Sequence, residues 1–402
     1  MTYRQSLFVL LVKFLNSFIA KVVEKEYVTI VLSISTTVMT KKSKKTSGSS
    51  SRRLIQTTKK YFSGLKKWQR RCLYVIFTII GLVMLNTLIY KLTPEVKNPK
   101  WGTSFSTQYA KELGVDWKAN FTALLDDLKI RNFRLMSYWD VSEPQPGVYN
   151  FSELDWQMDE AAKRGAKVSL SIGMRQPRWP ECHKPRWAKN LSREDEDKAI
   201  MKFTLHTVGR YKDHPALESY QLENEAVNNW FGACTPDDTD QKRLDKEFIA
   251  VKKADPNHPV YMSLSDQHGL PLNKPVPDKY GFSVYRIVWN DKSGPFKFYL
   301  TYPTPIWYHS LRAKWIKTFK DRDIFIHELQ VEPWGPTATV NMSVEEQNRS
   351  MSPSQIKTNI QFARKIGEPE IYTWGSEWWY WRKTHFNDPS IWETVRGEIN
   401  RD

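Results

Sequence analysis

The stretch NFRLMSYWDVSEPQPGVYNFSELDWQMDEAAKRGAKVSLSI, residues 132–172, contains the repeating unit on which the fold depends. Its first seven residues, 132–138, form a short apolar run typical of a strand, and EPQPG at 143–147 has the composition of a turn. A helix is expected at 154–164, ended by Gly165, because glycine readily takes the left-handed conformation that closes a helix. A second strand, KVSLSI, follows at 167–172. This order predicts two parallel strands joined by a helix.

The same alternation continues through the rest of the chain. Strands are expected at 101–106, 132–138, 167–172, 217–222, 260–264, 280–284, 324–327 and 369–374, and helices at 117–129, 154–164, 194–211, 240–254, 306–319, 353–366 and 390–400. Eight strands in about 300 residues predict an α/β fold of the (β/α)₈ barrel type. The main alternative is a doubly wound sheet. It loses support because no strand leads into GxGxxG or GxxxxGK[ST].

The positive charge of the chain lies almost entirely in its first quarter. The 402 residues carry a formal net charge of +16, from 60 Lys+Arg and 44 Asp+Glu. Residues 1–99 contain 18 Lys+Arg and 3 Asp+Glu, a net charge of +15. Residues 100–402 therefore contain 42 Lys+Arg and 41 Asp+Glu, a net charge of +1. A nearly neutral large domain gives little support to a nucleic-acid partner, and none is expected. DNA binding by the basic segment 1–71 alone is the alternative.

Residues 73–90 (LYVIFTIIGLVMLNTLIY) have the composition of a membrane-spanning helix. They contain no charge in 18 residues, and at about 1.5 Å per residue they span roughly 27 Å of hydrocarbon. The 12 Lys and Arg residues within 41–71, with no acid among them, place the N-terminus in the cytoplasm by the positive-inside rule. The expected topology is therefore a single-pass protein of the cell membrane with its large domain outside the cytoplasm.

The resulting domain plan has four parts. Residues 1–71 are expected to be a basic cytoplasmic tail, largely disordered, and 72–92 a transmembrane signal anchor in contact with membrane lipid. Residues 93–100 form a linker, and 101–402 the (β/α)₈ catalytic domain. A second span across 5–23 and a natural start at Met39 are alternatives for the tail.

Polar and aromatic side chains follow several of the expected strands at their carboxyl ends. In a (β/α)₈ barrel, these ends meet at one rim, where the functional site lies. The residues singled out are Arg134 and Trp139 from the second strand, Asn224 and Glu225 from the fourth, Tyr285 from the sixth, Glu328 from the seventh and Trp374 from the eighth. Two carboxylates from opposite sides of one rim form a constellation that points to catalysis.

With these residues, the chain resembles the retaining glycoside hydrolases of clan A, the cellulase-like (β/α)₈ enzymes, over about residues 101–396. In that clan the acid/base Glu follows an Asn at the end of strand four, which implies these roles for Glu225 and Asn224. The nucleophile ends strand seven, which implies Glu328, although Glu332 lies four residues further on and stays open as an alternative.

The resemblance also implies the supporting residues of the site. An Arg on strand two and a Tyr on strand six commonly bond the nucleophile, matching Arg134 and Tyr285, and an aromatic on strand eight floors the sugar subsite, matching Trp374. The segment 137–165, which includes Trp139, is similar to the clan's segment after strand two. The His that often precedes the strand-six Tyr is replaced by Val284.

Retaining hydrolysis requires two carboxyl groups about 5–5.5 Å apart, one protonated and one ionised. The expected function is a membrane-anchored retaining β-glycosidase that cleaves an oligo- or polysaccharide by double displacement, without a cofactor. The alternatives are a non-catalytic carbohydrate-binding barrel and a transglycosylase that remodels surface glycan.

Cys182 and Cys234 fall in the loops after strands three and four, which are neighbours in a barrel. Because thiols oxidise outside the cytoplasm, a disulfide between them is predicted, with two buried free thiols as the alternative. The eight histidines form no HExxH motif or close pair, so no metal site is expected.

Tryptophans are concentrated in the large domain, with 16 of 17 beyond residue 100. Such rings stack on sugar faces, but each one singly is as readily explained by core packing. The run GSEWWYW at 375–381 either lines a sugar cleft or packs the closing seam of the barrel. The other rings near expected rim loops are Trp139, Trp179, Trp187, Trp230, Trp289, Trp334 and Trp374.

Overall fold

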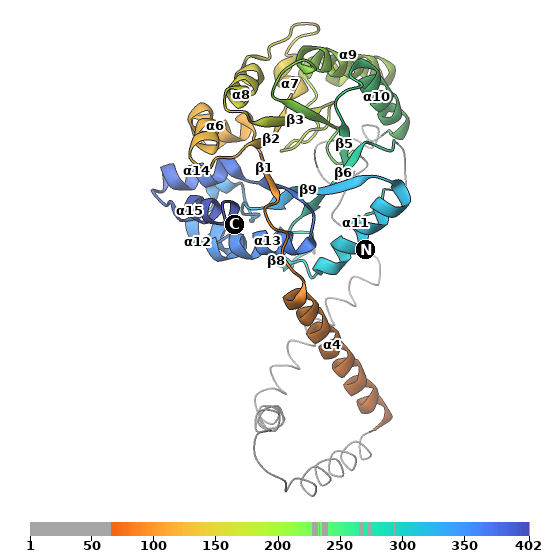
Figure 1. Ribbon diagram of the computed structural model, residues 1–402, viewed down its shortest axis with the longest axis vertical. Helices are drawn as coiled ribbons and strands as arrows, with labels where there is room; N and C mark the ends of the chain where they lie inside the picture. The colour runs from red at the N-terminus through yellow and green to blue at the C-terminus, as the bar shows by residue number, and fades with distance from the viewer. Residues whose placement is uncertain are drawn as a thin grey trace, which may run out of the picture. The chain divides into compact units, whose positions relative to one another are not determined.

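The computed structural model describes residues 66–226, 232, 234, 240–264, 269–271, 275–292 and 294–401 (Figure 1). The expectations for the tail, for a second span at 5–23 and for Trp230 lie outside these residues. The chain divides into two compact units, residues 1–82 and 83–402, and the second contains the large domain.

Eight parallel strands close into a barrel, as the sequence predicts. Their order around the barrel is β1, β10, β9, β6, β5, β4, β3 and β2. The strands are β1 (Lys100–Ser104), β2 (Asn132–Met136), β3 (Lys167–Ile172), β4 (Leu217–Leu222), β5 (Val260–Ser263), β6 (Lys279–Val284), β9 (Asp323–Gln330) and β10 (Glu370–Trp374). The bounds of β3 and β4 match the prediction.

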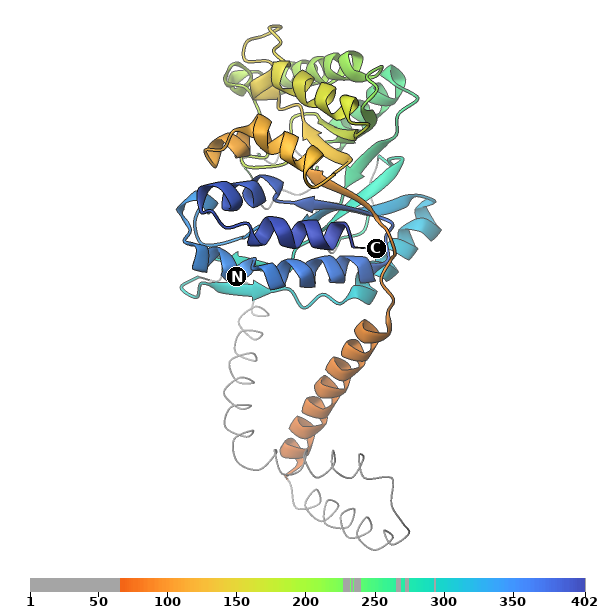
Figure 2. The same ribbon diagram turned by 60° about the vertical axis from the view of Figure 1, so that its left-hand side comes forward.

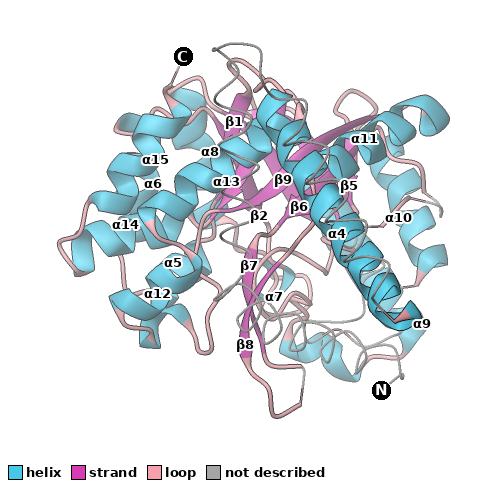
Figure 3. Cartoon of the chain, turned by 90° about the horizontal axis from the view of Figure 1, so that it is seen from below, coloured by secondary structure: helices cyan, strands magenta, loops and turns pink. Residues whose placement is uncertain are grey.

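Helices surround these strands, which lie inside the ring in the view from below (Figure 3). They are α5 (Thr107–Glu112), α6 (Trp117–Asp126), α7 (Trp139–Ser142), α8 (Ser152–Lys163), α9 (Arg193–Tyr211), α10 (Gln241–Ala254), α11 (Ile306–Lys320), α12 (Val344–Ser350), α13 (Pro353–Ile366), α14 (Ser376–His385) and α15 (Ser390–Ile399). Two 3₁₀ turns, Arg186–Asn190 and Thr339–Asn341, complete the described elements. The four helices that the sequence did not predict, α5, α7, α12 and α14, are short.

Long helices pack on the barrel through the faces that their spacing predicts. In α6, Phe121, Leu124 and Leu125 are buried, and the Asp116 side chain caps the helix by accepting hydrogen bonds from two backbone N–H groups of its first turn. Such a cap contributes about 1 kcal/mol, whereas the buried face contributes far more through the apolar area that it removes from water.

An antiparallel hairpin interrupts the alternation between β6 and α11. Its strands are β7 (Ile287–Asn290) and β8 (Phe298–Thr301), and Trp289 packs edge-on against Tyr299 with ring centroids 5.1 Å apart. Neither strand belongs to the repeating alternation of parallel strand and helix on which the sequence prediction was based.

The tryptophan-rich run at 375–381 packs inside the barrel wall. Trp378, Trp379 and Trp381 lie on α14 and are buried. The indole N–H of Trp379 donates to the carbonyl of Val331, 2.8 Å away. Of the two interpretations left open by the sequence, the described contacts favour the structural seam.

Among the described residues, one helix is long and apolar enough to cross a membrane, α4 (Lys67–Leu92), with 26 residues. It covers the uncharged run at 73–90.

The segment expected as a linker, residues 93–100, is fixed against the barrel. The Lys365 ammonium donates to the Thr93 carbonyl at 2.7 Å, and the backbone N–H of Val96 donates to the Arg364 carbonyl at 2.9 Å. Arg401 pairs with Glu95 at 2.5 Å. These contacts join the segment to α13 and to the end of the chain, so the last turn of α4 leads directly into the barrel (Figure 2).

Candidate active site

Glu328 lies two residues before the end of β9, and its hydrogen-bond donors come from β2 and from the residue that follows β6. The Arg134 guanidinium of β2 contacts one carboxylate oxygen at 2.6 Å, and the Tyr285 hydroxyl donates to the other at 2.9 Å. The Ser104 hydroxyl, cross-strand from Arg134 in the β1–β2 register, accepts from its Nε at 2.8 Å and orients it. The three residues that the sequence assigned to this cluster therefore lie together.

The charge around Glu328 favours its ionised form. Burial alone would raise the pKa of this carboxyl, but the neighbouring Arg134 guanidinium and the Tyr285 hydroxyl hold the pKa below its usual range. The adjacent His327 is neutral, because burial lowers its pKa to about 3. Arg134 is therefore the cation that keeps Glu328 a carboxylate at neutral pH.

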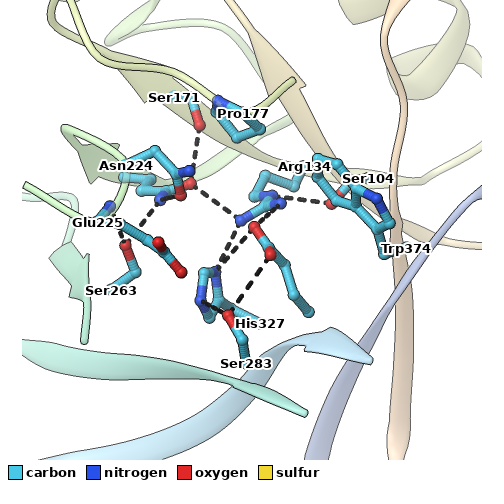
Figure 4. A network of polar contacts seen from close by, with 12 residues as sticks. Ser104, Arg134, Ser171, Pro177, Asn224, Glu225, Ser263, Ser283, His327 and Trp374 are labelled. Atoms are coloured by element: carbon cyan, nitrogen blue, oxygen red, sulfur yellow. Dashed lines mark hydrogen bonds and ion pairs between the residues drawn. The ribbon is translucent and has the colours of Figure 1, made fainter. Parts of the chain in front are cut away.

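Asn224 and Glu225 lie on the turn that follows β4. Glu225 has a positive φ of 44°, and its backbone N–H donates to the Ser263 hydroxyl of β5 at 2.7 Å. This left-handed turn directs the Glu225 carboxylate toward His327 (Figure 4). Burial raises the pKa of Tyr285 well above its usual value, and the negative charges of Glu328 and then Glu225 add to the effect. Both carboxylates therefore act on one phenol, while their separation of 5–5.5 Å stays a prediction.

The Asn224 amide is held from both sides. Its oxygen accepts from the Gln221 amide at 2.9 Å, and its nitrogen donates to the Glu181 carboxyl at 3.0 Å. An amide nitrogen carries two N–H donors, so the contact with Glu181 uses one of them. Glu181 is buried on the loop after β3, and sequence reasoning missed it because no motif distinguishes it.

One signal could have located Glu181, namely the neighbouring Cys182. The disulfide between Cys182 and Cys234 is present, with the two Cα atoms 5.2 Å apart, which confirms the prediction. It ties the loop after β3 to the loop after β4, so residue 181 must lie near the end of β4. Burial raises the pKa of Glu181 to about 8, an effect that the nearby charge of Glu328 increases, so this carboxyl is neutral at neutral pH.

Replacing Glu181 by glutamine is expected to change how stability depends on pH. Between pH 4.5 and about 8 the unfolded wild-type chain ionises at this position while the folded chain keeps its proton, so the unfolding free energy falls as pH rises. The glutamine variant does not lose this stability. As pH rises across this window, its unfolding free energy should increase relative to that of wild type by up to about 4 kcal/mol. Denaturant unfolding in detergent at both ends of the window measures the difference.

The exposed Glu194→Gln, on α9, is the control and should follow the wild-type pH dependence. If Glu181→Gln runs parallel to wild type as well, then Glu181 is ionised in the folded protein and its assignment as a neutral carboxyl is wrong.

Trp374, expected as the floor of a sugar subsite, lies at the end of β10 with its ring covered. Only 8% of the residue is exposed. The Arg178 guanidinium, from the loop after β3, lies 4.0 Å from the Trp374 ring centroid and 3.8 Å from that of Tyr109. A sugar could stack on this face of the indole only by displacing Arg178.

Glu332, the alternative nucleophile, belongs to a different ionic cluster. Its carboxylate is 2.5 Å from the Arg178 guanidinium and accepts from the Trp374 indole N–H at 2.5 Å. Arg178 also contacts the buried Glu377 at 3.0 Å. Burial raises the pKa of Glu332 despite the opposing charge of Arg178. These surroundings favour Glu328 over Glu332 as an ionised nucleophile.

The remaining aromatic candidates divide into buried and exposed rings. Trp139 is fully buried, and its indole N–H donates to Glu143 at 2.7 Å, so it packs beneath the rim. Trp179 and Trp334 are the exposed ones, at 76% and 49%. The Trp334 ring lies edge-on to Tyr285 with centroids 5.4 Å apart, which places one solvent-facing indole beside the cluster around Glu328.

Within the described part of the chain, no group of three or more His, Cys, Asp or Glu side chains has the arrangement of a metal site.

Comparisons with known proteins bear on the fold. No family model matches the chain. The GH5_18 protein from Streptomyces cattleya, solved in complex with GlcNAc, has a TM-score of 0.50 at 12% identity, covering 76% of this chain and 82% of its own. Xylanase10C from Cellvibrio japonicus, in complex with xylopentaose, has a TM-score of 0.49 at 15% identity, covering 77% and 68%.

A third similar structure is the β-galactosidase of the haloarchaeon Halorubrum lacusprofundi, with a TM-score of 0.48, 12% identity and coverage of 74% of this chain. This chain spans just over half of the length of that enzyme, 57%. At 12% identity, the likeness to the Streptomyces cattleya protein shows a shared barrel fold.

Proposed function

We propose that the chain is a membrane-anchored retaining glycoside hydrolase that cleaves a β-linked glycan. The observation that carries the proposal is the environment of Glu328, a buried carboxylate kept ionised by Arg134 at 2.6 Å and bonded by Tyr285 at 2.9 Å. Double displacement needs an ionised carboxylate as nucleophile and a second carboxyl group as acid and base. Glu328 is suited to the first role, and Glu225, directed toward the same cluster, to the second.

The first step forms a covalent glycosyl-enzyme. A carboxylate oxygen of Glu328 attacks the anomeric carbon, while the protonated Glu225 gives its proton to the glycosidic oxygen and the leaving sugar departs as an alcohol. The Tyr285 and Arg134 donors hold Glu328 in one orientation for this attack. Asn224, itself fixed by Gln221, is positioned to bond the sugar 2-hydroxyl, an interaction that strengthens in the transition state.

The second step releases the sugar. Glu225, now ionised, takes a proton from a water molecule, whose oxygen attacks the anomeric carbon, and the bond to Glu328 breaks. Glu225 regains its proton and Glu328 its negative charge, so the site returns to its starting state. An acceptor sugar in place of water would give transglycosylation by the same residues.

Membrane anchoring through α4 is the second part of the proposal. The helix is uncharged across 73–90 and follows a segment rich in Lys and Arg, a pattern that favours a cytoplasmic N-terminus and an extracytoplasmic barrel. The disulfide between Cys182 and Cys234 supports this side, because such bonds persist in oxidising compartments.

Labelling with a fluorinated sugar tests the proposed reaction. Aryl 2-deoxy-2-fluoro-β-glycosides form a glycosyl-enzyme that hydrolyses slowly. Mass spectrometry should therefore find one sugar adduct, on the peptide that contains Glu328. An adduct on Glu332 would reassign the nucleophile. Saturable binding of glycans with neither adduct nor turnover would show a carbohydrate-binding barrel instead.

A further inference from the structure

One face of α11 exposes a row of large apolar side chains. Trp307, Leu311, Trp315 and Phe319 recur at intervals of four residues, which places them along one side of the helix. Trp307, Leu311 and Phe319 are 42%, 59% and 69% exposed, and the half-buried Trp315 packs on Phe319 with centroids 5.3 Å apart. We call these four residues the α11 row. Contiguous apolar side chains of this size on a protein surface mark an interaction site.

Trp307, the first residue of the α11 row, contacts the apolar helix α4 near its C-terminal end. The indole N–H of Trp307 donates to the side-chain oxygen of Asn86, 3.2 Å away. One turn further on, Tyr90 stacks on Phe362 of α13 with centroids 6.4 Å apart. Trp307 is thus fixed at the level where the uncharged run 73–90 ends. If α4 crosses a bilayer, this level is the boundary between the outer headgroups and the hydrocarbon.

The segment after α4 keeps this placement fixed. Thr93 and Glu95 are held by α13 and by the end of the chain, as described above. The end of α4, from residue 83 on, is therefore fixed to the barrel, and the start of α11 lies beside it.

The charges of α11 select among the partners that an apolar row could take. Lys314, Lys317 and Lys320 alternate with the row along the same helix, and Lys317 is the one paired with acids, Glu368 and Asp323. A helix with aromatic and Leu residues on one face and lysines beside them is suited to the plane of an anionic lipid surface. Tryptophan in particular favours the headgroup level.

We infer that α11 docks on the outer surface of the membrane, with the α11 row among the lipid headgroups and the exposed Lys314 beside it paired with a lipid phosphate. This inference rests on the proposed role of α4 as a membrane span. It makes the membrane a second contact surface of the barrel, in addition to the anchor.

Site-specific fluorescence in nanodiscs tests the docking. The full chain carries Cys72→Ser, so that an introduced cysteine is the reactive one, and receives an environment-sensitive nitrobenzoxadiazole dye at Leu311→Cys. Nanodiscs with one copy each contain equal parts of phosphatidylcholine and phosphatidylglycerol, with or without a lipid that bears a nitroxide near its headgroup. Ile249→Cys on α10, at 65% exposed, is the matched surface control, and Val75→Cys reports on α4.

The expected result is a blue-shifted emission at Leu311 and quenching by the nitroxide lipid several-fold greater than at Ile249. If the dye at Val75 is quenched by a mid-chain nitroxide and the dye at Leu311 behaves like that at Ile249, the docking is wrong and the anchor stands. If Val75 is in water too, the anchor and the docking both fail. A blue shift at Leu311 without quenching by lipid would show that protein covers the row, and would also overturn the inference.

Discussion

Replacing Glu328 by glutamine is expected to lower kcat on an aryl β-glycoside by about 10⁴-fold or more, because the residue supplies the covalent bond of the proposed intermediate. The substitution keeps the volume of a side chain that is buried against Arg134 and Tyr285, so the barrel should still fold. KM should change far less than kcat, since the lost interaction is made in the transition state. Steady-state kinetics on the purified chain in detergent measure both.

Two companion variants make the assignment specific. Glu332→Gln should retain much more activity than Glu328→Gln, because Glu332 bonds Arg178 and the Trp374 indole instead of the Arg134 and Tyr285 pair. Glu328→Gly should regain turnover when azide is added, since the anion occupies the space of the missing carboxylate and attacks the sugar. The reverse order of the two glutamine variants, with azide rescue at residue 332, would contradict the proposed nucleophile.

Replacing Arg178 by alanine is expected to lower the unfolding free energy by about 3–5 kcal/mol, because it leaves Glu332 and Glu377 buried without their cation. The Arg178 side chain is 9% exposed and stacks between Tyr109 and Trp374, so its packing is lost as well. Chemical denaturation monitored by tryptophan fluorescence measures the loss.

Arg210→Ala is the matched control for charge and size. Arg210 pairs with Asp155 at 2.6 Å, but the two side chains are 43% and 34% exposed, and such surface pairs contribute about 1 kcal/mol or less. Adding Glu332→Gln and Glu377→Gln to Arg178→Ala should recover part of the stability, since the unpaired charges are removed. If Arg178→Ala lowers the unfolding free energy no more than Arg210→Ala does, the ion pairs of Arg178 with Glu332 and Glu377 do not stabilise the fold.

The barrel was predictable from sequence because its strands carry their own signal. In KVSLSI, Val168, Leu170 and Ile172 alternate with polar residues, and this strand was placed with its correct bounds. The polar residues that end the strands then identified Asn224, Glu225 and Glu328, since the strand ends of such a barrel meet at one rim. Arg134 was found in the same way, by its place on a strand.

Residues on loops could not be located in this manner. Arg178 and Glu181 lie between β3 and α9, in a stretch with no periodicity, and their long-range contacts to Glu332 and Asn224 depend on how that loop folds back over the rim. The β7–β8 hairpin was missed because it lies outside the alternation of parallel strand and helix that the prediction followed. Arg178, from the same loop, covers the Trp374 ring. The sequence placed Trp374 on its strand but could not show that this loop residue lies over its face.

The bond between Cys182 and Cys234 fixes the loop after β3 to the loop after β4. The loop that it fastens carries both Arg178, which caps Trp374, and Glu181, which steadies Asn224. In the reducing cytoplasm these thiols stay apart, whereas an oxidising compartment joins them. If the barrel is exported as proposed, this loop would take its final form only in a compartment where the disulfide can form.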